Sequence, residues 1–346
     1  MKPLVCALTA TLLLAMQGGA HAAPGDHVYS RPGQIVPAAD GARLNIYCMG
    51  SGSPTVVFDS GWEDWAPAWA VVQPQVAKWT RACSYDRAGA GFSSAGPMPR
   101  TSVRIADELR SALHNAGIKG PYILVGNAFG GDPVRTFADR YTKETAGLVL
   151  VEADASDVER KAMQDDDHRG NARNLIRLRE CRNAVATGKP LPLLPPRPGH
   201  PHRTCDQQFF RGLPEAEWSP QLNAKLLQIA QTKVTMYDAY ISEMEEMAWD
   251  EAWLQQHVRS LGSRPVRVLT TGNHGVGHLP ARNAQDPKHI EYERQIRLAQ
   301  ARWLTLSSNA KQIFPRHSSE YVEFDDPNVV IEAIREVYRH SPVASF

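Results

Sequence analysis

The sequence has almost no excess of charge of either sign, with 38 Lys and Arg residues against 37 Asp and Glu. A nucleic-acid-binding protein usually needs a basic excess to neutralise phosphates, so the composition excludes nucleic acid as an expected partner. Beyond the first residues, no apolar run approaches the roughly 20 residues of a membrane-spanning helix. The chain has 346 residues, 42% of them apolar. We therefore expect a globular protein with a sizeable core and no membrane span.

The N-terminal segment has the organisation of a secretory signal peptide. Lys2 is followed by an apolar run over residues 4–16 and by small residues ending in Ala20-His21-Ala22-Ala23. A membrane anchor is the alternative, but the run is too short to cross a bilayer. We predict that residues 1–22 are cleaved near Ala22 and that the mature protein is secreted or periplasmic.

Cysteine is scarce, with five residues in the whole chain. Removing the signal peptide takes Cys6 away and leaves Cys48, Cys83, Cys181 and Cys205, an even number in an oxidising compartment. No two of them show the close C-x-x-C spacing typical of zinc sites, which is the competing interpretation. We expect two disulfides, no metal site and no cofactor.

A nucleophile is missing from the stretch around which the chain is organised, Tyr122-Ile-Leu-Val-Gly-Asn-Ala-Phe-Gly-Gly131. An apolar run ends there in a glycine-framed turn and leads into a helix. The pattern is typical of a nucleophile elbow, G-x-S-x-G, in which the central side chain projects from a strained turn. Here the central residue is Ala128, and a methyl group cannot attack a carbonyl carbon. Either the glycines are coincidental, or this is the elbow of a serine hydrolase without its serine.

Apolar segments alternate with helical patterns, which predicts an α/β architecture with a mainly parallel sheet. Strands are expected at residues 43–48, 55–59, 82–85, 122–127, 147–152, 266–271 and 311–314, and helices near 70–77, 102–116, 292–307 and after Asp325. Trp62, Trp65 and Trp69 belong either to the core or to a ligand-binding wall.

The alternation breaks between residues 157 and 261, where the sequence is charged and helical and contains a proline-rich loop at 188–198. We predict a core made of residues 23–156 and 262–346, with 157–261 inserted as a lid in which a Cys181–Cys205 bridge joins the ends of that loop. Within the insert, Met236, Tyr240, Met244 and Met247 share one helix face. Such a face packs in a core or lines an adaptable apolar pocket.

Four stretches together resemble the α/β-hydrolase fold superfamily, in particular its secreted or cytoplasmic esterases and lactonases. They are Ser60-Gly61-Trp62 after a strand, residues 85–91, residues 126–131, and residues 321–327 before a terminal helix. The resemblance spans about residues 33–340 apart from the lid. It implies that the strands holding Cys48 and Cys83 are neighbours, so that a disulfide can join them.

The family's mechanism needs a serine, a histidine that removes its proton, an acid that orients the histidine, and two backbone N–H groups facing the oxyanion. By resemblance these N–H groups belong to Trp62 and Phe129. The histidine position is occupied by Glu320. His317, three residues earlier, is a possible displaced base.

Two further histidines and the acid remain to be placed by the same resemblance. His274 and His278 follow a predicted strand and either face the same cleft or are surface or structural residues. The acid is Glu152 or Asp154, unless both are ordinary polar residues at a strand end.

Substitution of two separate triad positions predicts a chain without catalytic activity, because loss of either one would abolish turnover. The first hypothesis is a secreted, non-catalytic protein that keeps its pocket for a small apolar ester-like or carboxylic ligand. The alternative is a serine hydrolase (esterase, lactonase or amidase) that has been inactivated or that acts through a displaced base such as His317. A purely structural role is the third possibility.

Overall fold

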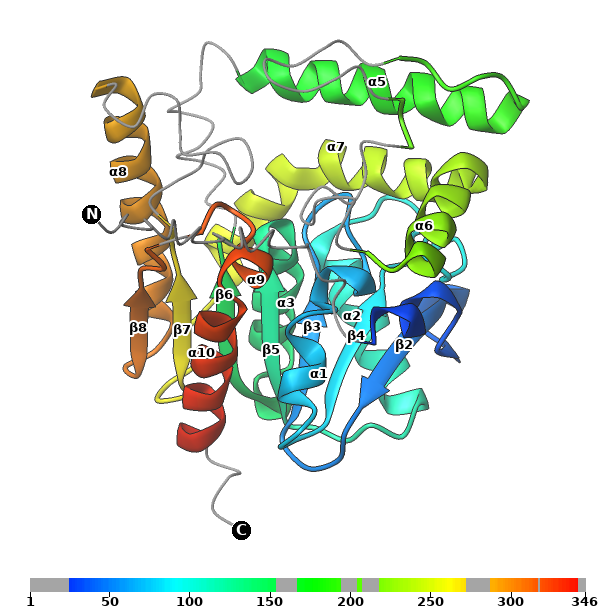
Figure 1. Ribbon diagram of the computed structural model, residues 1–346. Helices are drawn as coiled ribbons and strands as arrows, with labels where there is room; N and C mark the ends of the chain where they lie inside the picture. Colours follow the sequence, from blue (N-terminus) through cyan, green and yellow to red (C-terminus); the bar gives the residue numbers. More distant parts are fainter. Residues whose placement is uncertain are drawn as a thin grey trace, which may run out of the picture.

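The buried strands form one mainly parallel sheet in the computed structural model (Figure 1). The structure describes residues 25–153, 167–193, 204–206, 218–271, 287–316 and 318–341. Within them the strand order is β1-β2-β4-β3-β5-β6-β7-β8. Among these eight strands, only β1 with β2 and β2 with β4 pair antiparallel. The strands are β1 Gln34–Pro37, β2 Arg43–Met49, β3 Thr55–Asp59, β4 Ala82–Asp86, β5 Tyr122–Asn127, β6 Thr145–Val151, β7 Val266–Leu269 and β8 Ala310–Ile313.

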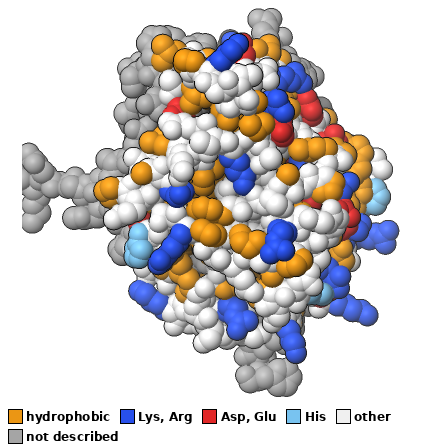
Figure 2. Space-filling view, turned by 90° about the vertical axis from the view of Figure 1, so that its right-hand side faces the viewer, with side chains coloured by type: hydrophobic (Ala, Val, Ile, Leu, Met, Phe, Trp, Pro, Cys, Tyr) orange, Lys and Arg blue, Asp and Glu red, His pale blue; other side chains and the backbone are white. Residues whose placement is uncertain are grey.

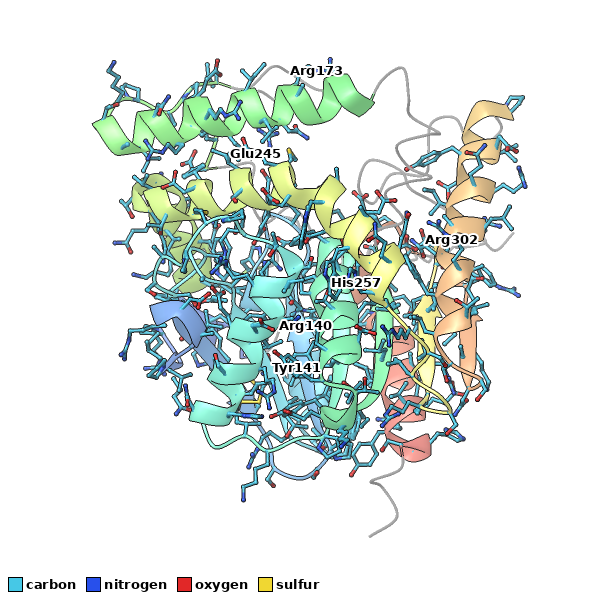
Figure 3. All side chains as sticks on the ribbon, turned by 180° about the vertical axis from the view of Figure 1, so that it is seen from behind. Arg140, Tyr141, Arg173, Glu245, His257 and Arg302 are labelled. Atoms are coloured by element: carbon cyan, nitrogen blue, oxygen red, sulfur yellow. A yellow bond between two sulfur atoms is a disulfide. The ribbon has the colours of Figure 1, made fainter. Side chains whose placement is uncertain are left out.

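Helices cover both faces of the sheet, which explains why its central strands are apolar without alternation. On the face toward the viewer in Figure 1 lie α1 (Gln73–Val76) and α10 (Pro327–His340). On the opposite face, seen in Figure 3, lie α2 (Ser102–Asn115), α3 (Gly131–Arg140) and α8 (Pro287–Ala301). Each face has its own apolar cluster, and neighbouring residues of one strand, such as Val56 and Val57, join different clusters.

Three helices in the segment between β6 and β7 lie over the carboxyl ends of the strands (Figure 1). They are α5 (Asp167–Thr187), α6 (Pro220–Thr232) and α7 (Val234–His257). An ion pair joins Arg179 of α5 to Glu245 of α7, and Glu245 lies between the two helices in Figure 3. These helices are where a lid was expected. The assignment of residues 157–261 as a separate lid stays a prediction.

Short helical turns occupy the connections. They are η1 Asp26–Ser30, η2 Ala39–Gly41, η3 Ala66–Trp69, η4 Ala128–Gly130, η5 Thr142–Glu144, η7 Arg302–Leu306 and α9 Val322–Asp325. The strand expected at 266–271 ends at Leu269, and two expected helices change in detail. The helix expected near 70–77 is shortened to α1, with η3 just before the expected range. The helix expected at 292–307 begins at Pro287 and tightens into η7. Tightening of a last turn satisfies carbonyls that an α-helix leaves free.

Both predicted disulfides are confirmed. Cys48 and Cys83 lie directly opposite each other on β2 and β4, and their sulfurs are bonded. Cys181 of α5 is bonded to Cys205, and both residues are 1% exposed. The predicted signal peptide, residues 1–22, lies outside the described residues. No helix in the described part of the chain is long and apolar enough to span a membrane.

The aromatic and methionine side chains that had two interpretations are mostly packed. Trp65 and Trp69 are 1% and 0% exposed, and Met236 and Tyr240 are both 0% exposed. Trp62, by contrast, is only partly buried. On the surface turned to the viewer in Figure 2, Lys and Arg side chains are spread among apolar and uncharged ones and form no single patch.

Candidate functional site

Ala128 lies at a sharp turn between β5 and the helical segment that follows. Its φ is 45°, in the left-handed region that L-residues rarely adopt. The two framing glycines, Gly126 and Gly130, are required because a side chain at either position would clash with backbone atoms. A Cβ at Gly126 would lie 2.4 Å from the Gly130 carbonyl oxygen, and one at Gly130 would lie 2.6 Å from the carbonyl oxygens of Asp59 and Ser60. The strand, strained turn and helix match the geometry of a nucleophile elbow, with a methyl group at its centre.

The loop after β3 lies directly against this turn. A Cβ placed on Gly61 would be 3.6 Å from the Ala128 methyl carbon. The next residue, Trp62, is anchored from above, because its indole Nε1 donates to the Tyr240 carbonyl of α7 at 3.0 Å. Phe129, which follows Ala128 in η4, is fully buried. The two residues predicted to supply oxyanion N–H groups therefore flank the turn. Their role as donors stays a prediction.

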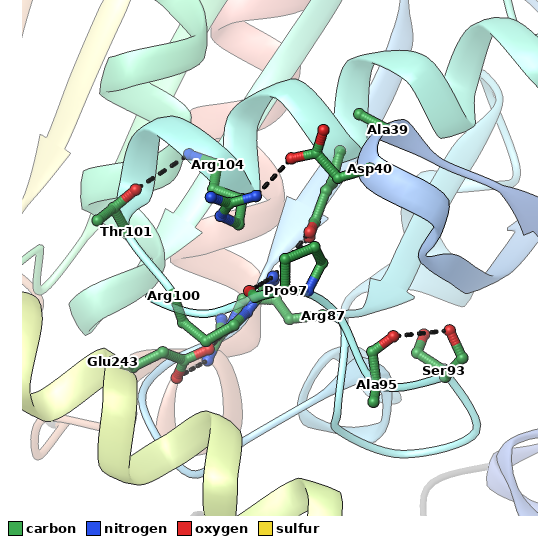
Figure 4. A network of polar contacts seen from close by, with 12 residues as sticks. Ala39, Asp40, Arg87, Ser93, Ala95, Pro97, Arg100, Thr101, Arg104 and Glu243 are labelled. Atoms are coloured by element: carbon green, nitrogen blue, oxygen red, sulfur yellow. Dashed lines mark hydrogen bonds and ion pairs between the residues drawn. The ribbon is translucent and has the colours of Figure 1, made fainter.

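A buried arginine holds that loop in place. Arg87 is 2% exposed and donates to the carbonyl oxygens of Ser60 at 2.6 Å and Gly61 at 2.7 Å. It also pairs with Asp59 at 2.8 Å and with Glu243 of α7 at 2.9 Å. Arg87 and Glu243 are both labelled in Figure 4, where α7 approaches the loops of the core. One guanidinium thus links the end of β3, the loop beside Ala128 and the helix above them.

The protonation of Asp59 in this cluster depends on opposing effects. Burial raises the pKa of Asp59, although the Arg87 guanidinium and the Tyr85 hydroxyl, 2.5 Å away, act in the opposite direction. The Arg87 guanidinium also lies 5.2 Å from the centre of the Phe129 ring. Sequence analysis did not assign Arg87 a role. Its signal was an arginine directly after an apolar strand, within the stretch 85–91 that resembles the family.

Glu320, at the predicted base position, is exposed and lies just before α9. The preceding residue, Ser319, is held by Asp325, whose Oδ2 accepts from the Ser319 N–H at 2.7 Å and hydroxyl at 2.6 Å. Glu323 then joins this segment to the elbow strand, because its Oε2 accepts from Asn127 Nδ2 at 3.2 Å. His317, His274 and His278 lie outside the described residues, so a displaced base stays an untested prediction.

Glu152, the first candidate acid, follows β6 in a left-handed conformation with φ 46° and is 5% exposed. This conformation ends the strand one residue earlier than expected. The side chain is held by the next strand and helix, because Oε2 accepts from Gln300 Nε2 at 3.0 Å and Oε1 accepts from the Thr271 N–H. Such contacts suit a strand-end structural residue as well as an acid. Asp154 lies outside the described residues.

Two further carboxyl groups, not singled out from the sequence, lie near the turn: Asp64, and Glu323, which accepts from the Asn127 side chain. Asp64 Oδ2 lies 3.6 Å from the position of a Cβ on Gly61, and burial, with Glu63 adding to it, raises the pKa of Asp64 to about 7. Burial also raises the pKa of Glu323 well above its usual range, and the charge of Asp64 contributes. Among the described residues, no group of three or more His, Cys, Asp or Glu is arranged to hold a metal ion.

The sheet order, the elbow turn and the loop against it are typical of the α/β-hydrolase fold, and the family comparison agrees. The model of the alpha/beta hydrolase fold family matches residues 54–323, so the chain belongs to this family. A related AB hydrolase superfamily protein of Gibberella zeae is 24% identical over 310 residues, which cover 83% of this chain and 86% of that protein.

Other relatives match over shorter stretches. An uncharacterized protein of Schizosaccharomyces pombe is 31% identical over 157 residues, 37% of this chain and 29% of that protein. The protein YbdG of Bacillus subtilis, also uncharacterized, is 32% identical over 115 residues, 33% of this chain and 35% of that protein. The match thus spans about a third of the length of these two relatives.

Solved structures share the fold at low sequence identity. A thermophilic esterase from Thermogutta terrifontis, with malate bound, has a TM-score of 0.56 and 20% identity, over 89% of this chain and 98% of that one. The epoxide hydrolase CorEH has a TM-score of 0.57 and 16% identity, over 88% and 98%. These similarities show the fold alone.

Proposed function

We propose that this chain is a secreted, non-catalytic member of the α/β-hydrolase family that binds a small ester-like ligand beside Ala128. The observation that carries the proposal is the methyl group of Ala128 at the centre of an otherwise complete elbow turn. An acyl-transfer mechanism needs an attacking oxygen or sulfur there, and alanine supplies neither.

The ligand class follows from the surroundings of the turn. Trp62 offers a partly buried indole, and backbone N–H groups near the turn can bind a carbonyl oxygen whatever the side chains are. Carboxyl groups of Asp64 and Glu323 lie close by. They favour an ester over the carboxylic acid that is the other candidate, because a bound carboxylate would meet like charge.

Export is part of the proposal. The Cys48–Cys83 and Cys181–Cys205 disulfides support it, because such bridges form and persist in oxidising compartments. The signal-like residues 1–22 supply the route. Mass spectrometry of the protein recovered from the periplasm or medium would test it, since the proposal requires an N-terminus near Ala23.

The test of the inactive site is a hydrolysis assay of the unaltered chain on p-nitrophenyl esters, with binding followed by tryptophan fluorescence on a panel of esters and lactones. We expect background turnover together with saturable quenching. Trp62→Phe should remove most of the signal, whereas the matched Trp249→Phe, on an exposed side chain of α7, should keep it. Absence of any response across the panel would refute ligand binding.

The competing function is an active hydrolase, and the folds shared with an esterase and an epoxide hydrolase make it worth testing. In that case the unaltered chain would turn over an ester, and His317→Ala or Glu320→Gln would abolish the activity. Such a result would overturn the non-catalytic proposal.

A further inference from the structure

Carboxyl groups from two segments that are far apart in the sequence lie near the elbow turn. Asp64 Oδ2 and the Ala128 methyl carbon each lie 3.6 Å from the same point, the Cβ position on Gly61, so they are within twice that distance of each other. In the C-terminal segment, Glu323 accepts a hydrogen bond from the side chain of Asn127, the residue before Ala128. The wall of the site beside the missing nucleophile is therefore acidic.

One of these carboxyl groups is incompletely satisfied. Glu323 is 1% exposed, and its Oε1 has no hydrogen-bond partner in the described part of the structure. Its other oxygen accepts from Asn127. Buried carboxyl oxygens without a partner are rare and costly, so such a group calls for a proton or a ligand. The charge of Asp64 acts on this group, which places the two carboxyls in one electrostatic unit.

In the part of the chain that the structure describes, the neighbouring cations are engaged with other acids. The loop's Glu63 is paired at 3.0 Å with Arg177 of α5. Arg87, which acts on Asp64, is shared between Asp59 and Glu243.

The remaining neighbours among the described residues are acidic or uncharged. On the C-terminal segment, Glu320 and Asp325 both act on Glu323 with the same sign of charge. Burial raises the pKa of the phenol groups of Tyr321 and Tyr240, and the charge of Asp64 adds to this increase. The local balance is thus negative once Asp64 and Glu323 are ionised.

Aromatic rings accompany the carboxyl groups. Phe324, next to Glu323, packs with its ring centre 6.2 Å from that of Trp218, edge to face. Trp62, Tyr240 and Phe324 belong to or pack on one apolar cluster under α7. Carboxylates together with aromatic faces are the combination that binds organic cations, through ion pairing and cation–π attraction.

We propose that the ligand held beside Ala128 carries a protonated amine or quaternary ammonium group, bound by Asp64 and Glu323 next to its ester. This inference rests on the proposed function, since it names the charge of the ligand bound at the same site. It predicts a linkage to pH. A cation favours the ionised carboxyls, so binding releases protons and its affinity rises as the pH rises through the pKa of Asp64 near 7.

The experiment compares two probes of the same shape on the unaltered protein. One is acetylcholine, and the other is its uncharged carbon isostere, in which a tert-butyl group replaces the trimethylammonium group. By calorimetry at pH 8 we expect acetylcholine to bind about tenfold tighter or more, and the preference to shrink at pH 5.5. Proton release, measured in two buffers of different ionisation enthalpy, should accompany acetylcholine only.

Variants then assign the effect. Asp64→Asn and Glu323→Gln should each reduce the preference for the cation, whereas Glu332→Gln, an exposed acid on α10, should leave it unchanged. Equal binding of the two probes, or tighter binding of the isostere, would overturn this inference and leave the proposed function standing. Failure of both probes and of the whole ester panel would refute the proposed function itself.

Discussion

Replacing Arg87 by methionine should destabilise the protein strongly, because this guanidinium is the only cation bonded to Asp59 and Glu243 within the described residues. Both acids are 0% exposed. Removing one partner of a buried ion pair typically costs about 3–5 kcal/mol. The carbonyls of Ser60 and Gly61 would also lose their donor. Because the two buried acids can relieve part of the strain by taking up a proton, we expect a total of about 3–5 kcal/mol.

The assay is urea unfolding followed by circular dichroism and tryptophan fluorescence at pH 7.5. Arg87→Lys should lie between wild type and Arg87→Met, because lysine keeps the charge without the planar fork. The matched control is Arg104→Met, which removes a partly exposed pair with Asp40 and should cost less than about 1 kcal/mol. If Arg87→Met lowers the free energy of unfolding as little as the control does, Arg87 does not hold the loop beside Ala128 in place. Unchanged ester binding in a folded Arg87→Met variant would also contradict that role.

Three further predictions follow from the described contacts. The intact mass of the oxidised protein should be four hydrogens below that of the reduced chain. Reduction of Cys48–Cys83 or of Cys181–Cys205 should each cost about 3–4 kcal/mol in urea unfolding, given sequence separations of 35 and 24. Free thiols in the native protein would contradict this. The single variants Ala128→Ser and Glu320→His should each hydrolyse p-nitrophenyl esters near the background rate, whereas the double variant should hydrolyse them clearly, because triad members act as a unit. Full activity of Ala128→Ser alone would mean that another histidine is the base. Burial raises the pKa of Asp250 to about 8, so between about pH 4 and 8 the native state holds a proton that the unfolded state has lost, and the free energy of unfolding should fall as the pH rises. In thermal unfolding at several pH values, Asp250→Asn should flatten this decrease. A decrease that persists in Asp250→Asn would mean that another group causes it.

Sequence reasoning predicted the fold and the elbow because both depend on local signals. Glycines at 126 and 130 are needed wherever the backbone packs this tightly, so their spacing indicates the turn without any structure. Runs of apolar residues without alternation, such as those of β3, β5 and β6, indicate strands covered on both faces. The Cys48–Cys83 bridge followed from the expected strand order, which the register of β2 and β4 confirms.

Element boundaries were less predictable from the sequence. β6 ends before Glu152 because that residue adopts a left-handed backbone, and nothing in a glutamate announces this. The short α9 before α10 was likewise not predicted, because the acidic stretch indicated a single helix start. Packing, and not propensity, decided these positions.

The composition of the site depended on the tertiary structure. Arg87 meets Glu243 across 156 residues of sequence, and Asn127 meets Glu323 across 196. No periodicity or motif spacing encodes such contacts, because they arise only when the sheet brings the carboxyl ends of β3, β4 and β5 to one edge and α7 lies above it. The sequence by itself predicted that Ala128 occupies the nucleophile position of the elbow turn. Only the folded chain brings Asp64 and Glu323 near this turn, and burial there raises the pKa of both carboxyl groups.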